Sequence, residues 1–330
     1  MANNTAALQV ASPTLWLSGL PALTTPRLLC YLAPMFLIVA AYAACALIWG
    51  TTWLAIRICI GPGGYDTLMA LVLRFAIASA VLLPMAWKVG RWPNRRQWTF
   101  LIIAGVLDAV SYTMVYWGEQ SLSGGLAAVI YGTQPFILAG ILGATKMERV
   151  WPTDIVGAAV SLTGVAGLFI GKLQLSTNQA VGVLLVLGSV FCSTCYSALV
   201  KRTASDVHAV TSTAIFLTVT ALCLTPLAVT SGGGLVLPDR ASATVALLYL
   251  ALAGSVIAFV LYFWLLQRVS MKAMSTLVFL FPVIALIADA IGERTQRIGW
   301  REMVAVVVIL GGMGIGYWGV RNRAAAAVAN

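Results

Sequence analysis

The chain has 330 residues, of which 61% are hydrophobic and 9% are charged, and its mean hydropathy is +0.95. Soluble domains contain roughly 45–50% apolar and 25% charged residues, so a chain this apolar would expose large hydrophobic patches in water. The composition therefore excludes an ordinary soluble enzyme, a disordered protein and a disulfide-rich secreted module. The net charge of +10 does not indicate nucleic-acid binding, because most Lys and Arg residues stand in short clusters between apolar runs, as membrane-flanking loops do.

Ten apolar segments follow one another along the chain, separated by polar residues. Each is apolar on all sides and close to the length of about 20 residues that a helix needs to cross a bilayer. The sequence therefore predicts an all-α polytopic membrane protein with ten transmembrane helices, between an N-terminal tail (1–33) that is retained and a C-terminal tail (321–330). The segments lie at about 34–58, 66–87, 98–118, 124–145, 152–171, 180–200, 208–230, 242–266, 273–291 and 299–320.

The two halves of the chain, 34–171 and 180–320, are similar to each other. Because each half has an odd number of predicted spans, five, the halves enter the membrane in opposite directions. Inverted repeats of this kind form carriers whose binding site lies at the repeat interface near the middle of the membrane. Shifting the first half by 147 residues places Trp117 on Trp264, Gln120 on Gln267, Ser123 on Ser270 and Pro135 on Pro282, and a shift of 145 places Glu148-Arg149 on Glu293-Arg294.

The distribution of Lys and Arg predicts the orientation. With the N-terminus inside, thirteen Lys and Arg residues lie on the cytoplasmic side and six on the outer side, with Arg74 within a span. Because positive residues concentrate in cytoplasmic loops, this distribution favours both termini in the cytoplasm. A basic cluster from Arg294 to Arg301 on the outer side runs against the trend.

Several motifs, taken in order, resemble one transporter family. The first segment contains Leu47-Ile48-Trp49-Gly50-Thr51-Thr52-Trp53, and the second contains Leu73-Arg74-Phe75. In each half a proline, Pro135 or Pro282, precedes an acidic–basic pair and a Gly-rich helix. Over about residues 34–320 the chain resembles the EamA family of the drug/metabolite transporter superfamily. The resemblance implies ten helices in a 5+5 inverted repeat, a bacterial inner membrane, and export of amino acids or other small metabolites. Asp108 and Asp289 depart from the apolar or small residues usual at these positions.

Two ionisable residues lie deep within the predicted spans. Arg74 is about eight residues from the outer end of its segment and Asp108 is about ten from the outer end of the next. At roughly 1.5 Å per residue their depths differ by about 3 Å, which predicts an ion pair. The pair could lock the two helices together, or Arg74 could leave Asp108 to engage a substrate carboxylate, which suits its planar guanidinium.

Aromatic residues form the second set of candidate substrate-binding residues. Trp49 and Trp53 are four residues apart, as are Tyr112 and Tyr116, so each pair shares a helix face. Small-ligand cavities are lined by aromatic and apolar groups with a few polar ones. The alternative is ordinary helix packing. Tyr131 and Tyr262 complete the set.

Four further residues are candidates for hinges or gates. Pro135 and Pro282 stand inside predicted spans, where proline removes a backbone hydrogen bond and kinks a helix. They would be flex points or would fix a static shape. Glu148 and Glu293 lie near helix ends, on opposite membrane sides in the inverted topology. They would anchor loops, or take part in gating or proton coupling.

The remaining patterns do not indicate catalysis. The residue spacing shows no metal site, no cofactor and no nucleophile–base–acid set, so an enzyme is not predicted. We expect a secondary transporter that exports small organic solutes, chiefly amino acids or related metabolites, by alternating access. The main alternative is efflux of multiple drugs or of cationic and aromatic compounds, and a polytopic membrane enzyme is less favoured. The expected partners are a small-molecule substrate and membrane lipid, without nucleic acid. The sequence leaves open the identity of the substrate, the coupling to protons and the oligomeric state, for which a monomer is one of the alternatives.

Overall fold

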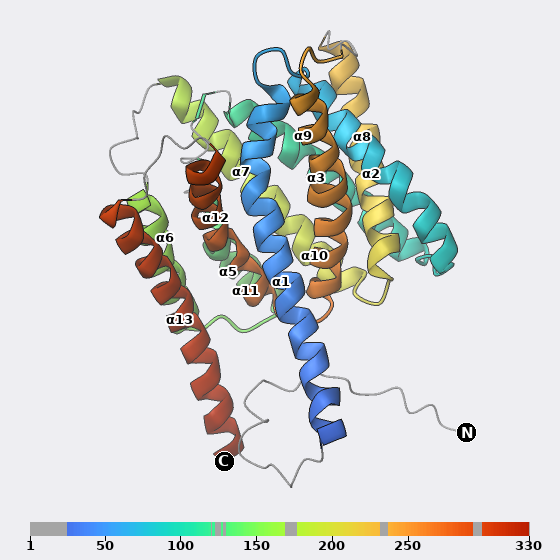
Figure 1. Cartoon of the computed structure of the whole chain (residues 1–330). Coiled ribbons are helices and arrows are strands. Elements are labelled where there is room, and N and C mark those ends of the chain that lie inside the picture. The colour runs from blue at the N-terminus through green and yellow to red at the C-terminus, as the bar shows by residue number, and fades with distance from the viewer. Residues whose placement is uncertain are drawn as a thin grey trace, which may run out of the picture.

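The computed structural model describes residues 25–119, 121–122, 127, 130–168, 177–231, 237–292 and 299–329, and all regular structure in these ranges is helical (Figure 1). In chain order the helices are α1 (Thr25–Ile60), α2 (Thr67–Val89), α3 (Arg95–Glu119), α5 (Gln134–Thr145), α6 (Pro152–Leu168), α7 (Thr177–Thr203), α8 (Ala209–Thr230), α9 (Ala241–Ala251), the π-helix η2 (Leu252–Ile257), α10 (Ala258–Leu266), α11 (Met271–Ser275), α12 (Leu277–Gly292) and α13 (Trp300–Ala329).

Each of the ten predicted segments contains helical residues in the part of the chain that the structure describes. In the described part of the chain, seven helical stretches are long and apolar enough to cross a membrane. They lie in α1, α2, α3, α7, α8, the continuous stretch Ala241–Leu266, and α13. Two apolar helices are shorter, Gln134–Thr145 and Met271–Ala285. The structure thus confirms an all-helical protein with multiple apolar spans.

The segments 124–145 and 273–291 are not the continuous helices that the sequence predicts. Gly132 and Thr133 form a turn before α5, and Thr276 separates α11 from α12. Pro135 therefore lies in the first turn of α5 and does not kink a span. A first-turn amide has no partner within the helix, so a proline there loses no hydrogen bond. Pro282, in contrast, lies inside α12 as predicted.

The helices pack in pairs drawn from the two halves of the chain. α2 packs against α8, and α6 packs against α13. α3 contacts α7 and α8, while α1 contacts α9, α10 and α12. In Figure 1, α6 and α13 stand side by side at one flank of the molecule, away from α2 and α8.

Small residues allow α6 and α13 to approach closely. A Cβ atom on Gly157 would lie 2.7 Å from the carbonyl oxygen of Gly312, and the Ser161 hydroxyl donates to the carbonyl of Ile309 at 3.0 Å. Gly312 and Gly316, four residues apart on α13, both lie at this contact. Small residues at this spacing are typical of closely packed membrane helices. Gly167 is looser, since its Cβ would lie 3.7 Å from that of Ala305, and Gly171 lies outside the described residues.

The third span of the second half contains a π-helix that the sequence does not predict. In η2 the amide of Ala258 donates to the carbonyl of Ala253, five residues earlier, and the Ser255 hydroxyl donates to Leu250 at 3.1 Å. π-helical turns within α-helices are rare and are frequent at functional sites. This one faces Arg74 and Trp49.

Candidate functional site

A cavity of about 130 Å³ lies among α1, α2, α3, α7, α10 and α12. Seven of the eight substrate-binding residues predicted from the sequence line it: Trp49, Trp53, Arg74, Tyr112, Tyr116, Tyr131 and Tyr262. The sequence interpretation missed the other lining residues, which are Thr52, Ile56, Ser111, Val115, Gln134, Ser193, Tyr196, Ser197, Phe259, Met274, Leu277, Val278 and Phe281.

Arg74 is the charged residue of the cavity wall. Its side chain is 2% exposed, its Nε donates to Ser255 Oγ at 2.9 Å, and its Nη2 lies 3.5 Å from the Tyr112 hydroxyl. The guanidinium carbon lies 5.3 Å from the ring centres of both Phe75 and Tyr112, close enough for cation–π attraction. Among the described side chains, no carboxylate forms a hydrogen bond or ion pair with Arg74. The cavity wall therefore carries a buried positive charge held by neutral groups.

The π-helix η2 supplies polar groups to this wall. Ser255 Oγ accepts from Arg74, and the carbonyl of Gly254 accepts from Trp49 Nε1 at 3.1 Å. A Cβ on Gly254 would lie 3.4 Å from Arg74 Nη2 and 3.2 Å from Thr52 Cγ2, so glycine leaves room for the guanidinium. η2 thus positions Arg74 and Trp49 together.

Asp108 does not line the cavity and does not form the predicted ion pair with Arg74. Its side chain is completely buried, and Oδ2 accepts from Thr220 Oγ1 of α8 at 3.0 Å. The depth difference estimated from the sequence, about 3 Å, was too small by about half a turn. Arg74 is seven residues from the start of α2, but Asp108 is eleven from the end of α3. At 1.5 Å per residue these depths differ by about 6 Å, and the residue of α3 at the depth of Arg74 is Tyr112.

The aromatic side chains form an interlocking wall. The ring of Trp49 lies 5.4 Å from that of Phe259, 5.1 Å from that of Tyr262 and 6.0 Å from that of Phe281. Such edge-on and tilted arrangements are the favoured geometries of aromatic pairs. One turn further along α1, the Trp53 and Tyr131 rings lie 6.2 Å apart. The predicted face of α1 therefore points to the cavity.

Serines of α7 fix the tyrosine hydroxyls. Tyr262 donates to Ser197 Oγ at 2.9 Å, and the Tyr131 hydroxyl lies 2.8 Å from Ser189 Oγ. Ser111 of α3 also bonds Ser189 at 2.8 Å. The sequence signal for this face was the spacing of Ser189, Ser193 and Ser197 at four-residue intervals in an apolar helix, which puts them on one stripe.

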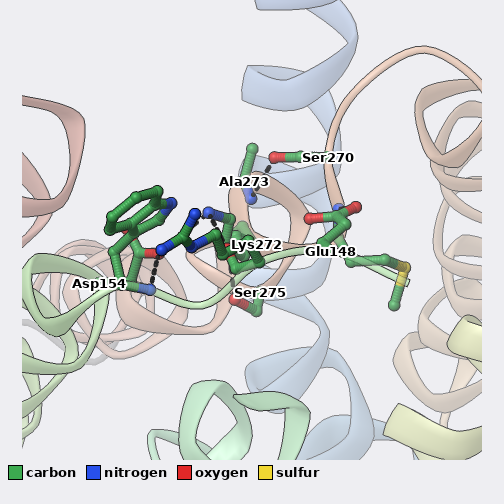
Figure 2. Close-up of polar contacts among 9 residues, drawn as sticks. Glu148, Asp154, Ser270, Lys272, Ala273 and Ser275 are labelled. Carbon is green, nitrogen blue, oxygen red and sulfur yellow. Dashed lines mark hydrogen bonds and ion pairs between the residues drawn. The ribbon is translucent and has the colours of Figure 1, made fainter. Parts of the chain in front are cut away.

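A second polar cluster joins the two halves of the chain near the start of α11 (Figure 2). Glu148 Oε1 accepts from the amide of Met271 at 2.7 Å, and Lys272 Nζ lies 2.9 Å from Asp154 Oδ2. Lys272 also donates to the carbonyl of Arg149 at 3.0 Å. Glu148 therefore contacts the other half of the chain, as a loop anchor or gate would. Glu293, its predicted counterpart, lies outside the described residues.

Lys201 of α7 contacts the end of α10 and the loop that leads to α11. Its Nζ donates to the carbonyls of Leu266 and Val269, at 2.7 and 2.6 Å, where α10 ends. No group of three or more metal-ligating side chains occurs in the part of the chain that the structure describes.

These features define a multi-pass membrane protein with a central aromatic cavity. The EamA-like transporter family matches residues 32–170 and 180–317, so the chain belongs to this family and contains two of its repeats. It is therefore a transporter of the drug/metabolite transporter superfamily.

Curated relatives agree with this assignment. The uncharacterized inner membrane transporter YedA of Escherichia coli K12 is 28% identical over 284 residues, covering 84% of this chain and 89% of YedA. Protein PagO of Salmonella typhimurium is 24% identical over 250 residues (73% of this chain, 80% of PagO). A probable terminal-alkyne amino-acid exporter of Streptantibioticus cattleyicolor is 26% identical over 246 residues (72% and 80%).

The fold has also been seen in a crystal structure of another protein. That chain is 18% identical and superposes with a TM-score of 0.71, covering 86% of this chain and 98% of the other. At this identity the match establishes the fold.

Proposed function

We propose that this protein is a secondary transporter that exports small organic solutes, chiefly amino acids or related metabolites, across the bacterial inner membrane. The observation that carries the proposal is Arg74, a buried cation in the cavity wall without a carboxylate partner among the described side chains. A charge inside the membrane is costly unless it is paired or serves a function. A solute carboxylate entering the cavity supplies the missing partner, and Arg binds carboxylates through two parallel hydrogen bonds.

The surroundings of Arg74 suit an amino acid with an apolar side chain. Trp49, Trp53 and Tyr262 offer an apolar surface, while Ser193 and Ser197 offer hydroxyl groups in the same cavity. The name of the Streptantibioticus relative, a probable terminal-alkyne amino-acid exporter, supports the same class. The aromatic rings would also suit a cationic compound through cation–π contact, but the guanidinium of Arg74 repels a cation, so efflux of cationic drugs is the weaker candidate.

The helix packing supports a 5+5 inverted repeat of ten spans. With α1, α2, α3, α5 and α6 as the first five-helix unit, the main inter-unit contacts have counterparts with the units exchanged. α2 pairs with α8 and α6 with α13, at equal positions in the two units. The contact of α3 with α7 has its counterpart in that of α1 with α9 and α10, and the contact of α1 with α12 has its counterpart in that of α5 with α7. We place the repeats at 34–171 and 180–320.

Alternating access would then follow from the two units rocking about the cavity. Glu148 and Lys272 join the units on one side of the cavity, and Pro282 offers a flexible point within α12. Both termini would be cytoplasmic. A reporter cysteine at Ala2 or Asn330, in a variant without native cysteines, should be protected from an impermeant thiol reagent in intact cells.

Counterflow in proteoliposomes tests the function. Liposomes containing the purified protein and loaded with unlabelled amino acids should take up labelled amino acids of the same kind, and they should not take up tetraphenylphosphonium. Arg74→Gln should strongly reduce the uptake at low amino-acid concentration, while Arg96→Gln, a change of an exposed arginine, should retain it. Uptake of the cation alone would establish the alternative, and chemical conversion of a solute would indicate an enzyme.

A further inference from the structure

Asp108 is a buried ionisable group that the proposed substrate cavity does not use. It lies at the contact between α3 and α8, where Gly105 lets the helices approach: a Cβ on Gly105 would lie 2.7 Å from the carbonyl oxygen of Phe216. This approach brings Thr220 to the carboxyl group. Asp108 is fully buried, and its Oδ1 has no hydrogen-bond partner.

The hydrogen bonds around Thr220 indicate the protonation state of Asp108. Thr220 Oγ1 lies 3.0 Å from Asp108 Oδ2, 3.0 Å from the carbonyl of Phe216 and 3.1 Å from that of Gly105. A hydroxyl has one hydrogen to donate, so it cannot satisfy three acceptors. If Asp108 is protonated, its own O–H donates to Thr220 Oγ1, and the threonine hydrogen is free to bond a backbone carbonyl.

The oxygen Oδ1 of Asp108, which has no hydrogen-bond partner, also indicates that the carboxyl group is protonated. An ionised carboxylate buried with one oxygen unbonded is far more costly than a neutral carboxyl group in the same place. The charged and titratable groups around Asp108 are Arg74 from α2, Tyr196 from α7 and Tyr112 on α3 itself. Arg74 is the cation among them, and it is bonded to Ser255 instead.

We propose that Asp108 is a proton-binding site of this transporter, that it holds a proton in the conformation described here, and that loss of this proton displaces the solute from Arg74. The displacement rests on the carrier function proposed above, but the proton site does not. Tyr112, which Arg74 reaches, is one helical turn from Asp108. When Asp108 releases its proton, its carboxylate competes with the solute carboxylate for the guanidinium, and the solute leaves. When a proton returns, Arg74 is free to bind solute again. The proton on Asp108 thus controls solute binding at Arg74.

Infrared difference spectroscopy of the purified protein tests the proton site without any solute. The wild type at neutral pH should show the C=O stretching band of a protonated carboxyl group that Asp108→Asn lacks. Thr220→Val should shift the frequency of this band, because the hydroxyl acceptor is lost. Asp66→Asn, at an exposed helix N-cap, should leave the band unchanged. A spectrum identical in wild type and Asp108→Asn would overturn the proposal. If Asp108→Asn does not fold, the Thr220→Val variant decides, and an unshifted band in that variant would overturn the proposal.

Amino-acid counterflow at acidic and alkaline pH tests whether loss of the Asp108 proton displaces the solute. In the wild type the apparent affinity should fall severalfold as the pH rises, because the carboxylate then competes for Arg74. In Asp108→Asn the affinity should be the same at both pH values. A pH dependence that survives in Asp108→Asn would refute this displacement. Absence of counterflow at any pH would refute the carrier function, while the infrared band would still decide the proton site.

Discussion

Replacing Arg74 by glutamine separates a substrate-binding role from a structural one. The guanidinium makes hydrogen bonds within the protein, among them those to Ser255 and to Tyr112. A glutamine amide retains polar atoms near them, and the change removes a buried charge whose desolvation costs several kcal/mol. These contributions oppose each other, so we expect the free energy of unfolding to change by less than about 2 kcal/mol.

The effect on binding should be much larger than the effect on stability. Losing a hydrogen bond between charged groups costs about 1.5–3 kcal/mol, which corresponds to a loss of affinity of roughly 10- to 150-fold. Arg74→Lys keeps the charge but not the planar fork, so its affinity should lie between those of the wild type and Arg74→Gln. Binding would be measured as the half-saturating amino-acid concentration in counterflow, and stability as the thermal midpoint in detergent. If Arg74→Gln fails to fold while Arg74→Lys transports normally, the arginine is a structural cation and the carboxylate hypothesis is refuted.

Three further predictions follow from individual contacts. Trp49→Phe should lower the unfolding free energy by about 1–2 kcal/mol, because it removes the hydrogen bond from the indole N–H to Gly254. Trp53→Phe should not, because the indole N–H of Trp53 has no hydrogen-bond partner. Thermal denaturation of the two variants compares them. Gly312→Ala should destabilise by about 1–3 kcal/mol through overpacking, since its Cβ would lie 2.6 Å from a backbone oxygen of α6, while Gly311→Ala has open space and should not. Glu148→Ala should speed hydrogen exchange at the start of α11, and Glu148→Gln, which keeps an acceptor, should change it less; equal rates in the two variants would contradict the anchoring role.

The sequence was sufficient for the features that depend on composition and helical spacing. Uniformly apolar segments predicted the helices, and four-residue spacing predicted which faces of α1 and α3 point inward. Trp49 and Trp53 share one face of α1, and Tyr112 and Tyr116 share one face of α3, and all four line the cavity. Such predictions succeed because an α-helix fixes the angle between residues on one element, whatever that element packs against.

The sequence was insufficient where the result depends on how two elements lie relative to each other. The Arg74–Asp108 pair failed because α2 begins and α3 ends one residue later than predicted, and these shifts add, so that the depths of the two residues differ by about 6 Å and not 3 Å. The predicted position of Pro135 inside a continuous helix was wrong because a turn before it begins a new helix. The π-helix η2 was missed because its sequence, Leu-Ala-Gly-Ser-Val-Ile, is an ordinary apolar run, and packing of Arg74 and Trp49 against it is visible only in three dimensions.

The missing ion pair has a consequence for selectivity. If Arg74 were paired with Asp108, the cavity would be neutral, and a solute carboxylate would have to displace a partner already in place. With one helical turn between them and Thr220 bonded to Asp108, the guanidinium instead stays bound to the neutral groups of Ser255 and Tyr112. Neutral partners position the charge without cancelling it, so the cavity keeps a positive potential that attracts anionic groups and repels cations. The separation of the two residues is therefore what allows the same arginine to bind a solute.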